Sequence, residues 1–158
     1  MANTPSVIMA QRLALAVPAL LLGGAYISQY GFGLYPCEMC WWQRWPHFAA
    51  VGLALLSFFS PPKRLWIALA AVAILISGVI GGFHAGVEYG WWEGVTNCAA
   101  IPSAGGGSAL EQIMNQPLVR CDAPAWTLFG ISLAGYNFLI SMASGIAILW
   151  LLMRGKRA

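Results

Sequence analysis

Two long stretches of this chain carry no ionised side chain, and they constrain the fold more than any other feature. No Asp, Glu, Lys or Arg lies between Arg12 and Glu38, or between Asp122 and Arg154. An α-helix needs roughly 20 apolar residues to cross a bilayer, so each stretch is long enough for a membrane span. Charged residues make up only 8% of the chain, whereas a soluble domain carries about 25%. The sequence therefore predicts an integral membrane protein, and a scattered net charge of +3 does not indicate nucleic-acid binding.

The apolar runs and the prolines divide the chain into four expected helices. These helices cover about 12–30, 43–60, 65–86 and 127–152, with loops at about 31–42 and 87–126. In the second loop, Ser108–Gln116 has apolar residues at helical spacing after a possible capping serine, which predicts a short amphipathic helix on the bilayer. We therefore expect a single all-α membrane domain over residues 1–158, folded as a four-helix bundle. Gly78, Gly82 and Gly86 lie four apart, a spacing that lets helices approach closely.

The positive charges predict an orientation. Six of the eight Lys and Arg residues fall on one side of a four-helix arrangement: Arg12, Lys63, Arg64, Arg154, Lys156 and Arg157. The positive-inside rule places that side, with both termini, in the cytoplasm. All five acidic residues and all four cysteines then lie on the outward side, where disulfides form and persist.

A Cys-x-x-Cys pair, Cys37 and Cys40, lies just before the second expected helix. The charge of Arg44 favours a thiolate, so Cys40 is a candidate reactive sulfur, although Glu38 opposes this effect. A zinc site with four cysteines prefers two close pairs, whereas the other two cysteines have 22 residues between them. Relayed thiol–disulfide exchange is therefore the favoured interpretation. A non-enzymatic membrane scaffold, with two structural disulfides or a bound zinc ion, is the alternative.

Taken together, these features resemble the DsbB family, the membrane quinone reductases that reoxidise the periplasmic thiol oxidase DsbA. The resemblance is carried by Pro36-Cys37-x-x-Cys40 with Arg44, by His84 ahead of Cys98, and by Cys121 followed by Trp126 and residues 128–132. It implies a multi-pass protein of the bacterial inner membrane with both termini in the cytoplasm. It also implies an enzyme that oxidises a periplasmic DsbA-like thioredoxin-fold partner and reduces ubiquinone or menaquinone.

The resemblance implies a role for each residue near the expected quinone. Cys37 and Cys40 match the pair next to the quinone, and Cys40 would be the sulfur that meets the ring. Arg44 matches the arginine that favours the thiolate and contacts a quinone oxygen. His84 matches a second contact to a quinone oxygen, although an interfacial histidine bonded to a carbonyl or a water is the alternative. No metal is expected, and Glu88 is expected to be a solvated loop charge.

The remaining two cysteines match the family's second pair. Cys98 would be attacked by the reduced partner, and Cys121, its pair partner, could exchange with Cys37. The sequence leaves open whether the resting pairs are Cys37 with Cys40 and Cys98 with Cys121, or a rearranged set, because four cysteines allow three pairings. DsbA-type partners are strong oxidants with reduction potentials of about −120 mV. Removing their electrons therefore needs a sink such as a quinone. A vitamin K epoxide reductase-like protein is the nearest alternative, but its Cys-x-x-Cys usually lies near the start of the last helix.

Overall fold

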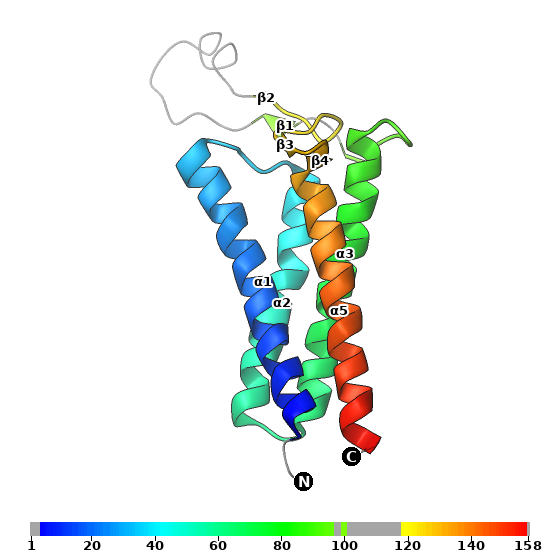
Figure 1. Cartoon of the computed structure of the whole chain (residues 1–158). Helices are drawn as coiled ribbons and strands as arrows, with labels where there is room; N and C mark the ends of the chain where they lie inside the picture. Colours follow the sequence, from blue (N-terminus) through cyan, green and yellow to red (C-terminus); the bar gives the residue numbers. More distant parts are fainter. Residues whose placement is uncertain (1–3, 97–98, 101–117, 158) are drawn as a thin grey trace.

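Four long helices lie side by side in the computed structural model of the chain (Figure 1). The structure describes residues 4–96, 99–100 and 118–157. The helices are α1 (Pro5–Phe32), α2 (Glu38–Phe59), α3 (Lys63–Glu88) and α5 (Leu133–Arg157). Two short antiparallel ribbons join β1 (Ala99–Ala100) to β2 (Leu118–Val119) and β3 (Thr127–Leu128) to β4 (Ile131–Ser132). The chain is therefore mostly helical, as expected, and the two ribbons are additions that the sequence did not predict.

Small residues bring the helices close together. The main buried cluster is rich in alanine, including Ala10, Ala14, Ala50, Ala54, Ala70 and Ala71. A Cβ added at Gly78 would lie 3.1 Å from the Cβ of Ser141 in α5, and one at Gly82 would lie 2.8 Å from the ring of Phe138. The expected close approach at these two glycines is confirmed, and their neighbour is α5. Gly86 instead accommodates the ring of Trp92.

Three helices of the described part of the chain are long and apolar enough to cross a membrane: α1, α3 and residues 133–155 of α5. The protein is therefore a helical, multi-pass membrane protein. Helix α2 is not among the three, because its first half carries Gln43, Arg44 and His47. These three side chains are buried inside the bundle. The expected crossing of the bilayer by α2 stays a prediction.

Three helix starts differ from the expected ones, and each has a local cause. Helix α1 begins at Pro5 instead of about residue 12, because proline fits the first helical position after Thr4. Helix α2 begins at Glu38 instead of about residue 43, so Cys40 lies inside the helix. Helix α5 begins at Leu133 instead of about residue 127, because the β3–β4 hairpin occupies the residues before it.

The hairpin before α5 turns through Phe129 and Gly130, which both have positive φ (51° and 77°). Tyr89, just after α3, fastens it: the Tyr89 hydroxyl donates to Gly130 O (3.0 Å) and accepts from Ser132 N (2.9 Å). Ser132 then caps α5, since Gly135 N donates to its Oγ at 3.1 Å. The β3–β4 hairpin is thus held against the end of α3. Both termini and the α2–α3 turn lie at the opposite end of the bundle (Figure 1). The amphipathic helix expected at Ser108–Gln116 falls outside the described residues.

Candidate functional site

The first turn of α2 brings the Cys-x-x-Cys sulfurs together. Cys37 is the N-cap residue with an extended backbone, and its Sγ accepts a hydrogen bond from Cys40 N at 3.3 Å. The two Sγ atoms lie 2.8 Å apart. Because the N-terminal end of a helix favours negative charge, the position of Cys40 in this turn supports a thiolate there. Both residues are free cysteines in this structure.

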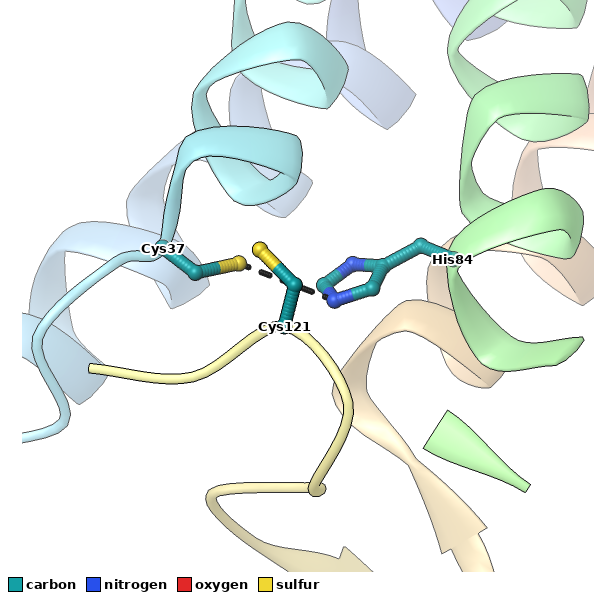
Figure 2. A group of neighbouring side chains, drawn as sticks. All are labelled: Cys37, His84 and Cys121. Atoms are coloured by element: carbon teal, nitrogen blue, oxygen red, sulfur yellow. Dashed lines mark hydrogen bonds between the residues drawn. The ribbon is translucent and has the colours of Figure 1, made fainter. Parts of the chain in front are cut away.

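Three buried side chains from distant parts of the chain converge beside this turn. Figure 2 shows Cys37 from the start of α2, His84 from α3 and Cys121 from the loop after β2. Their two Sγ atoms and a His84 ring nitrogen all lie within 4.8 Å of one another, and His84 Nε2 is 3.6 Å from Cys37 Sγ. Met39 and Val87 pack against the two cysteines in a small apolar cluster. The neighbouring Cys40 and the burial of Cys37 raise the pKa of the Cys37 thiol far above its usual range. Negative charge on the reduced pair therefore belongs on Cys40.

Arg44 is buried one turn further along α2, with only 6% of its surface exposed. Its Nη1 donates to Gln29 Oε1 at 2.7 Å and its Nη2 to Ala25 O at 3.2 Å, both in α1. The guanidinium carbon lies 4.9 Å from the centre of the Tyr26 ring and 5.0 Å from that of Trp41. These contacts fix the cation in place, and no carboxylate in the described part of the chain pairs with it, so its charge stays available to Cys40 or to a bound oxygen atom.

A cavity of about 260 Å³ lies between α1, α2 and α5, at the cysteine end of the bundle. Leucines of α1 line one wall, including Leu20 and Leu21, and Cys40, Arg44 and His84 provide polar groups on the other side. This combination of apolar walls with a few polar groups is typical of a small-molecule site.

A chain of buried amide and hydroxyl groups runs behind His84. Gln43 Nε2 lies 2.8 Å from His84 Nδ1, and Gln43 Oε1 accepts from Asn137 Nδ2 at 2.8 Å. Asn137 Oδ1 in turn accepts from His47 Nε2 at 2.9 Å and from Ser141 Oγ at 3.0 Å. Neither Gln43 nor Asn137 was predicted from the sequence to belong to the site. Polar residues in apolar spans are rare and often functional, and this rule could have identified both.

The structure corrects the expected solvation of Glu88. Its side chain is only 7% exposed, and Oε1 lies 3.7 Å from His84 Nε2. Its other oxygen, Oε2, is buried without a hydrogen-bond partner in the described part of the chain. Glu88 is at the last turn of α3, one turn after His84, and therefore belongs to the candidate site. Asp122, by contrast, is exposed and pairs with Arg120 at 2.6 Å, which lowers the pKa of its carboxyl group.

Five of the six residues singled out in the sequence lie together in the structure: Cys37, Cys40, Arg44, His84 and Cys121. The sixth, Cys98, lies outside the described residues. Cys37, His84 and Cys121 have donor atoms that could hold a metal ion, but only if His84 Nε2 carries a lone pair.

The chain matches known proteins over most of its length. Residues 9–151 match the family model described as "Disulfide bond formation protein DsbB". A disulfide bond formation protein B of Verminephrobacter eiseniae is 33% identical, with 98% of this chain and 90% of that protein aligned. One from Azoarcus sp. is 32% identical, covering 88% of this chain and 87% of the relative. An uncharacterized protein of Rickettsia prowazekii, RP370, is 26% identical over 81% of this chain and 77% of its own length. No solved structure matches the chain.

Proposed function

The chain belongs to the DsbB family of membrane oxidoreductases that form disulfide bonds, and we propose that it reoxidises a periplasmic DsbA-like partner and passes the electrons to a membrane quinone. One observation carries the proposal furthest. The sulfur cluster of Cys37, Cys40 and Cys121 adjoins a largely apolar cavity that Cys40 and Arg44 also line. A thiol relay and an acceptor site thus share one sulfur, Cys40.

The contact between Cys37 and Cys121 supports the thiol half of the relay. When Cys37 and Cys40 form a disulfide, the Cys121 thiolate is placed to attack Cys37 Sγ. A Cys37–Cys121 bond then forms, the Cys37–Cys40 bond breaks, and Cys40 leaves with the electron pair as a thiolate. The helix terminus and Arg44 both favour that leaving thiolate. Cys37 is the sulfur shared by both disulfides, consistent with its position between Cys40 and Cys121.

The cavity supports the quinone half. A quinone supplies a two-electron, two-proton sink when it is bound. Arg44 would donate to one ring oxygen, and the α1 leucines would cover the ring faces and exclude water. Glu88 and His84 lie at the same cavity wall and can hold protons near Cys40. Ubiquinone and menaquinone both fit this description.

The arrangement of the chain supports the proposed location. The cysteine site lies at one end of the bundle, and both termini lie at the other (Figure 1). In a bacterial inner membrane with both termini in the cytoplasm, the site would face the periplasm, where a thioredoxin-fold partner could reach Cys98. The whole chain, residues 1–158, would act as a single membrane domain with four spans.

The alternatives have less support. A vitamin K epoxide reductase-like protein is disfavoured by the match to the DsbB family and by the Cys-x-x-Cys at the start of α2. A scaffold with inert disulfides does not account for a buried arginine and a cavity beside Cys40.

The proposal is tested by counting thiols in a steady-state assay with detergent-purified protein. A reduced DsbA-like partner is mixed with catalytic amounts of the protein, with and without a soluble ubiquinone or menaquinone analogue, under anaerobic conditions. We expect partner thiols to disappear only with a quinone present, two thiols for each quinone reduced. Cys121→Ser should abolish turnover, whereas Ser144→Ala, at a half-buried position of α5 outside the cavity lining, should retain it. Quinone-independent turnover, or none with either quinone, would contradict the proposal.

A further inference from the structure

The two ring nitrogens of His84 face different chemistry. Nδ1 lies 2.8 Å from the amide nitrogen of Gln43. Nε2 faces the site, 3.6 Å from Cys37 Sγ and 3.7 Å from Glu88 Oε1. A neutral imidazole has a proton on one nitrogen and a lone pair on the other. The chemistry that His84 can perform therefore depends on which atom of Gln43 points toward Nδ1.

A backbone carbonyl fixes the amide of Gln43. Its Nε2 lies 3.2 Å from Met39 O, which can only accept a hydrogen bond. At the other end of the amide, Oε1 accepts from Asn137 Nδ2. Turning the amide over would set oxygen against the Met39 carbonyl and would set two NH₂ groups against each other.

Asn137 is oriented by the same logic. Its Nδ2 lies 3.2 Å from the backbone oxygen of Ser77, again an obligate acceptor. Its Oδ1 receives hydrogen bonds from His47 and Ser141. Both ends of the Asn137 amide are therefore assigned. The backbone carbonyls of Met39 in α2 and Ser77 in α3 therefore determine which end of each amide donates and which end accepts.

We propose that Gln43, oriented by Asn137 and the Met39 carbonyl, holds neutral His84 as the tautomer with its proton on Nε2. Gln43 Nε2 donates to Nδ1, so Nδ1 must carry the lone pair. Nε2–H then faces Cys37 Sγ and Glu88, and it can donate to the Cys37 sulfur or stabilise the carboxylate of Glu88. Gln43 and Asn137 are positioning residues, because both act on the sulfur cluster only through His84.

The same tautomer keeps a metal ion out of the site. The Cys37, His84 and Cys121 donors lie within 4.8 Å of one another, so they could gather around one metal ion, and the 3.6 Å between Cys37 Sγ and His84 Nε2 matches the roughly 3.5 Å between sulfur and nitrogen ligands of zinc. A histidine that binds zinc through Nε2 normally donates its Nδ1–H to a carboxylate or a carbonyl. Here Nδ1 accepts instead, which leaves the reduced thiols open for exchange. The inference concerns the protein's own imidazole and does not depend on the proposed electron acceptor.

The direct test is imidazole ¹⁵N NMR on the reduced full-length protein, without partner or quinone, at about pH 8, above the ordinary titration range of histidine. The chain has two histidines, and a His47→Phe sample assigns their signals. We expect His84 in the wild type to show a protonated Nε2 and an unprotonated Nδ1. A protonated Nδ1 in the wild type would overturn the inference, and the variant is needed only to assign the signals.

The second test replaces the hydrogen-bond donor that faces His84 Nδ1 with an acceptor. In Gln43→Glu the carboxylate can only accept at this pH, so His84 should switch to the Nδ1–H tautomer and expose a lone pair at Nε2. Zinc affinity of the reduced protein, measured by competition with a chromogenic chelator, should then rise by about 10–100-fold. Gln11→Glu is the matched control, because Gln11 is also buried and bonds Ser57 in α2 at 3.0 Å. A Gln43→Glu protein with the wild-type tautomer and zinc affinity would refute the assigned role.

Discussion

At the scale of single residues, the site separates the roles of two neighbouring cysteines. Cys37 is 3% exposed, and Cys40 and its burial raise the pKa of its thiol. Cys40 has the more open position, at the wall of the cavity that it shares with Arg44. The two sulfurs of one short motif therefore differ in both charge and access.

Alkylation of the reduced protein should reveal this difference. We predict that iodoacetamide at neutral pH modifies Cys40 before Cys37, because the thiolate is the reactive form and the raised pKa keeps Cys37 protonated. As pH rises through the ordinary cysteine range, Cys37 should remain the slower site. Peptide mass spectrometry of time points measures both rates. Equal rates at the two sulfurs would mean that the pair shares its charge.

Arg44 should act mainly on the bound acceptor. Arg44→Ala removes the donor groups held by Gln29 and Ala25, and we predict that the KM for a quinone analogue rises about tenfold, equivalent to ~1.4 kcal/mol. Arg44→Lys keeps the charge without the planar fork and should have an intermediate KM. An unchanged KM and kcat in Arg44→Ala would remove Arg44 from the site.

The sequence was informative about the reactive residues and uninformative about those that orient them. Cys37 caps α2, and Cys40 and Arg44 lie in its first two turns. Their spacing along the sequence was therefore enough to group them. Gln43 and Asn137 meet through a 2.8 Å contact across 94 positions of sequence. Neither belongs to a local motif, and their amides meet only because α2 and α5 both pack against α3.

At the scale of helices and strands, the contact between α3 and α5 positions the site. Gly81 of α3 faces α5 so closely that an added Cβ would lie 2.9 Å from Asn137 Nδ2 and 3.0 Å from Ala134 O. A Cβ added at Gly52 in α2 would meet no atom within 4 Å. The two glycines form a matched pair for testing the interface.

We predict that Gly81→Ala lowers the thermal unfolding temperature, because overpacking a tight contact costs about 1–3 kcal/mol. Gly52→Ala should leave it unchanged or raise it slightly, because alanine favours helix by up to ~1 kcal/mol. Thermal unfolding in the same detergent compares the two. An equal effect of both substitutions would mean that the α3–α5 contact is looser than described.

Helix ends were harder to predict than helix bodies. The sequence indicated each apolar run, but Glu38, Trp41 and Trp42 read as loop residues although they belong to the first turns of α2. Residues 127–132 continued an apolar run without a charge, yet they form the β3–β4 hairpin. Tyr89, from a different loop, stabilises that hairpin, and such a tertiary contact leaves no pattern in the local sequence.

At the scale of the whole molecule, both termini lie opposite the cysteine site (Figure 1). The excess of Lys and Arg near the termini and the α2–α3 turn predicts that this end faces the cytoplasm. Helix α2 links the two ends, although its first half is polar. Its polar groups are buried against the other helices, so a crossing of the bilayer by α2 is physically reasonable.

Alkaline phosphatase fusions can test this topology. We predict high phosphatase activity for fusions after Gly33 and after Gly94, and low activity for fusions after Ser60 and at the C-terminus. A green fluorescent protein fused to the C-terminus should fluoresce. Equal phosphatase activity after Gly33 and Ser60 would show that α2 does not cross.

The central claim is that Cys40 joins a thiol relay to a quinone in the adjoining cavity. Its most direct test is a single-turnover stopped-flow measurement of quinone absorbance, with quinone-loaded protein mixed with an excess of reduced DsbA-like partner. The account predicts that wild-type protein loses one equivalent of quinone absorbance in a fast phase and that Cys40→Ser loses none while remaining folded. Loss of quinone absorbance at the same rate in Cys40→Ser would contradict it.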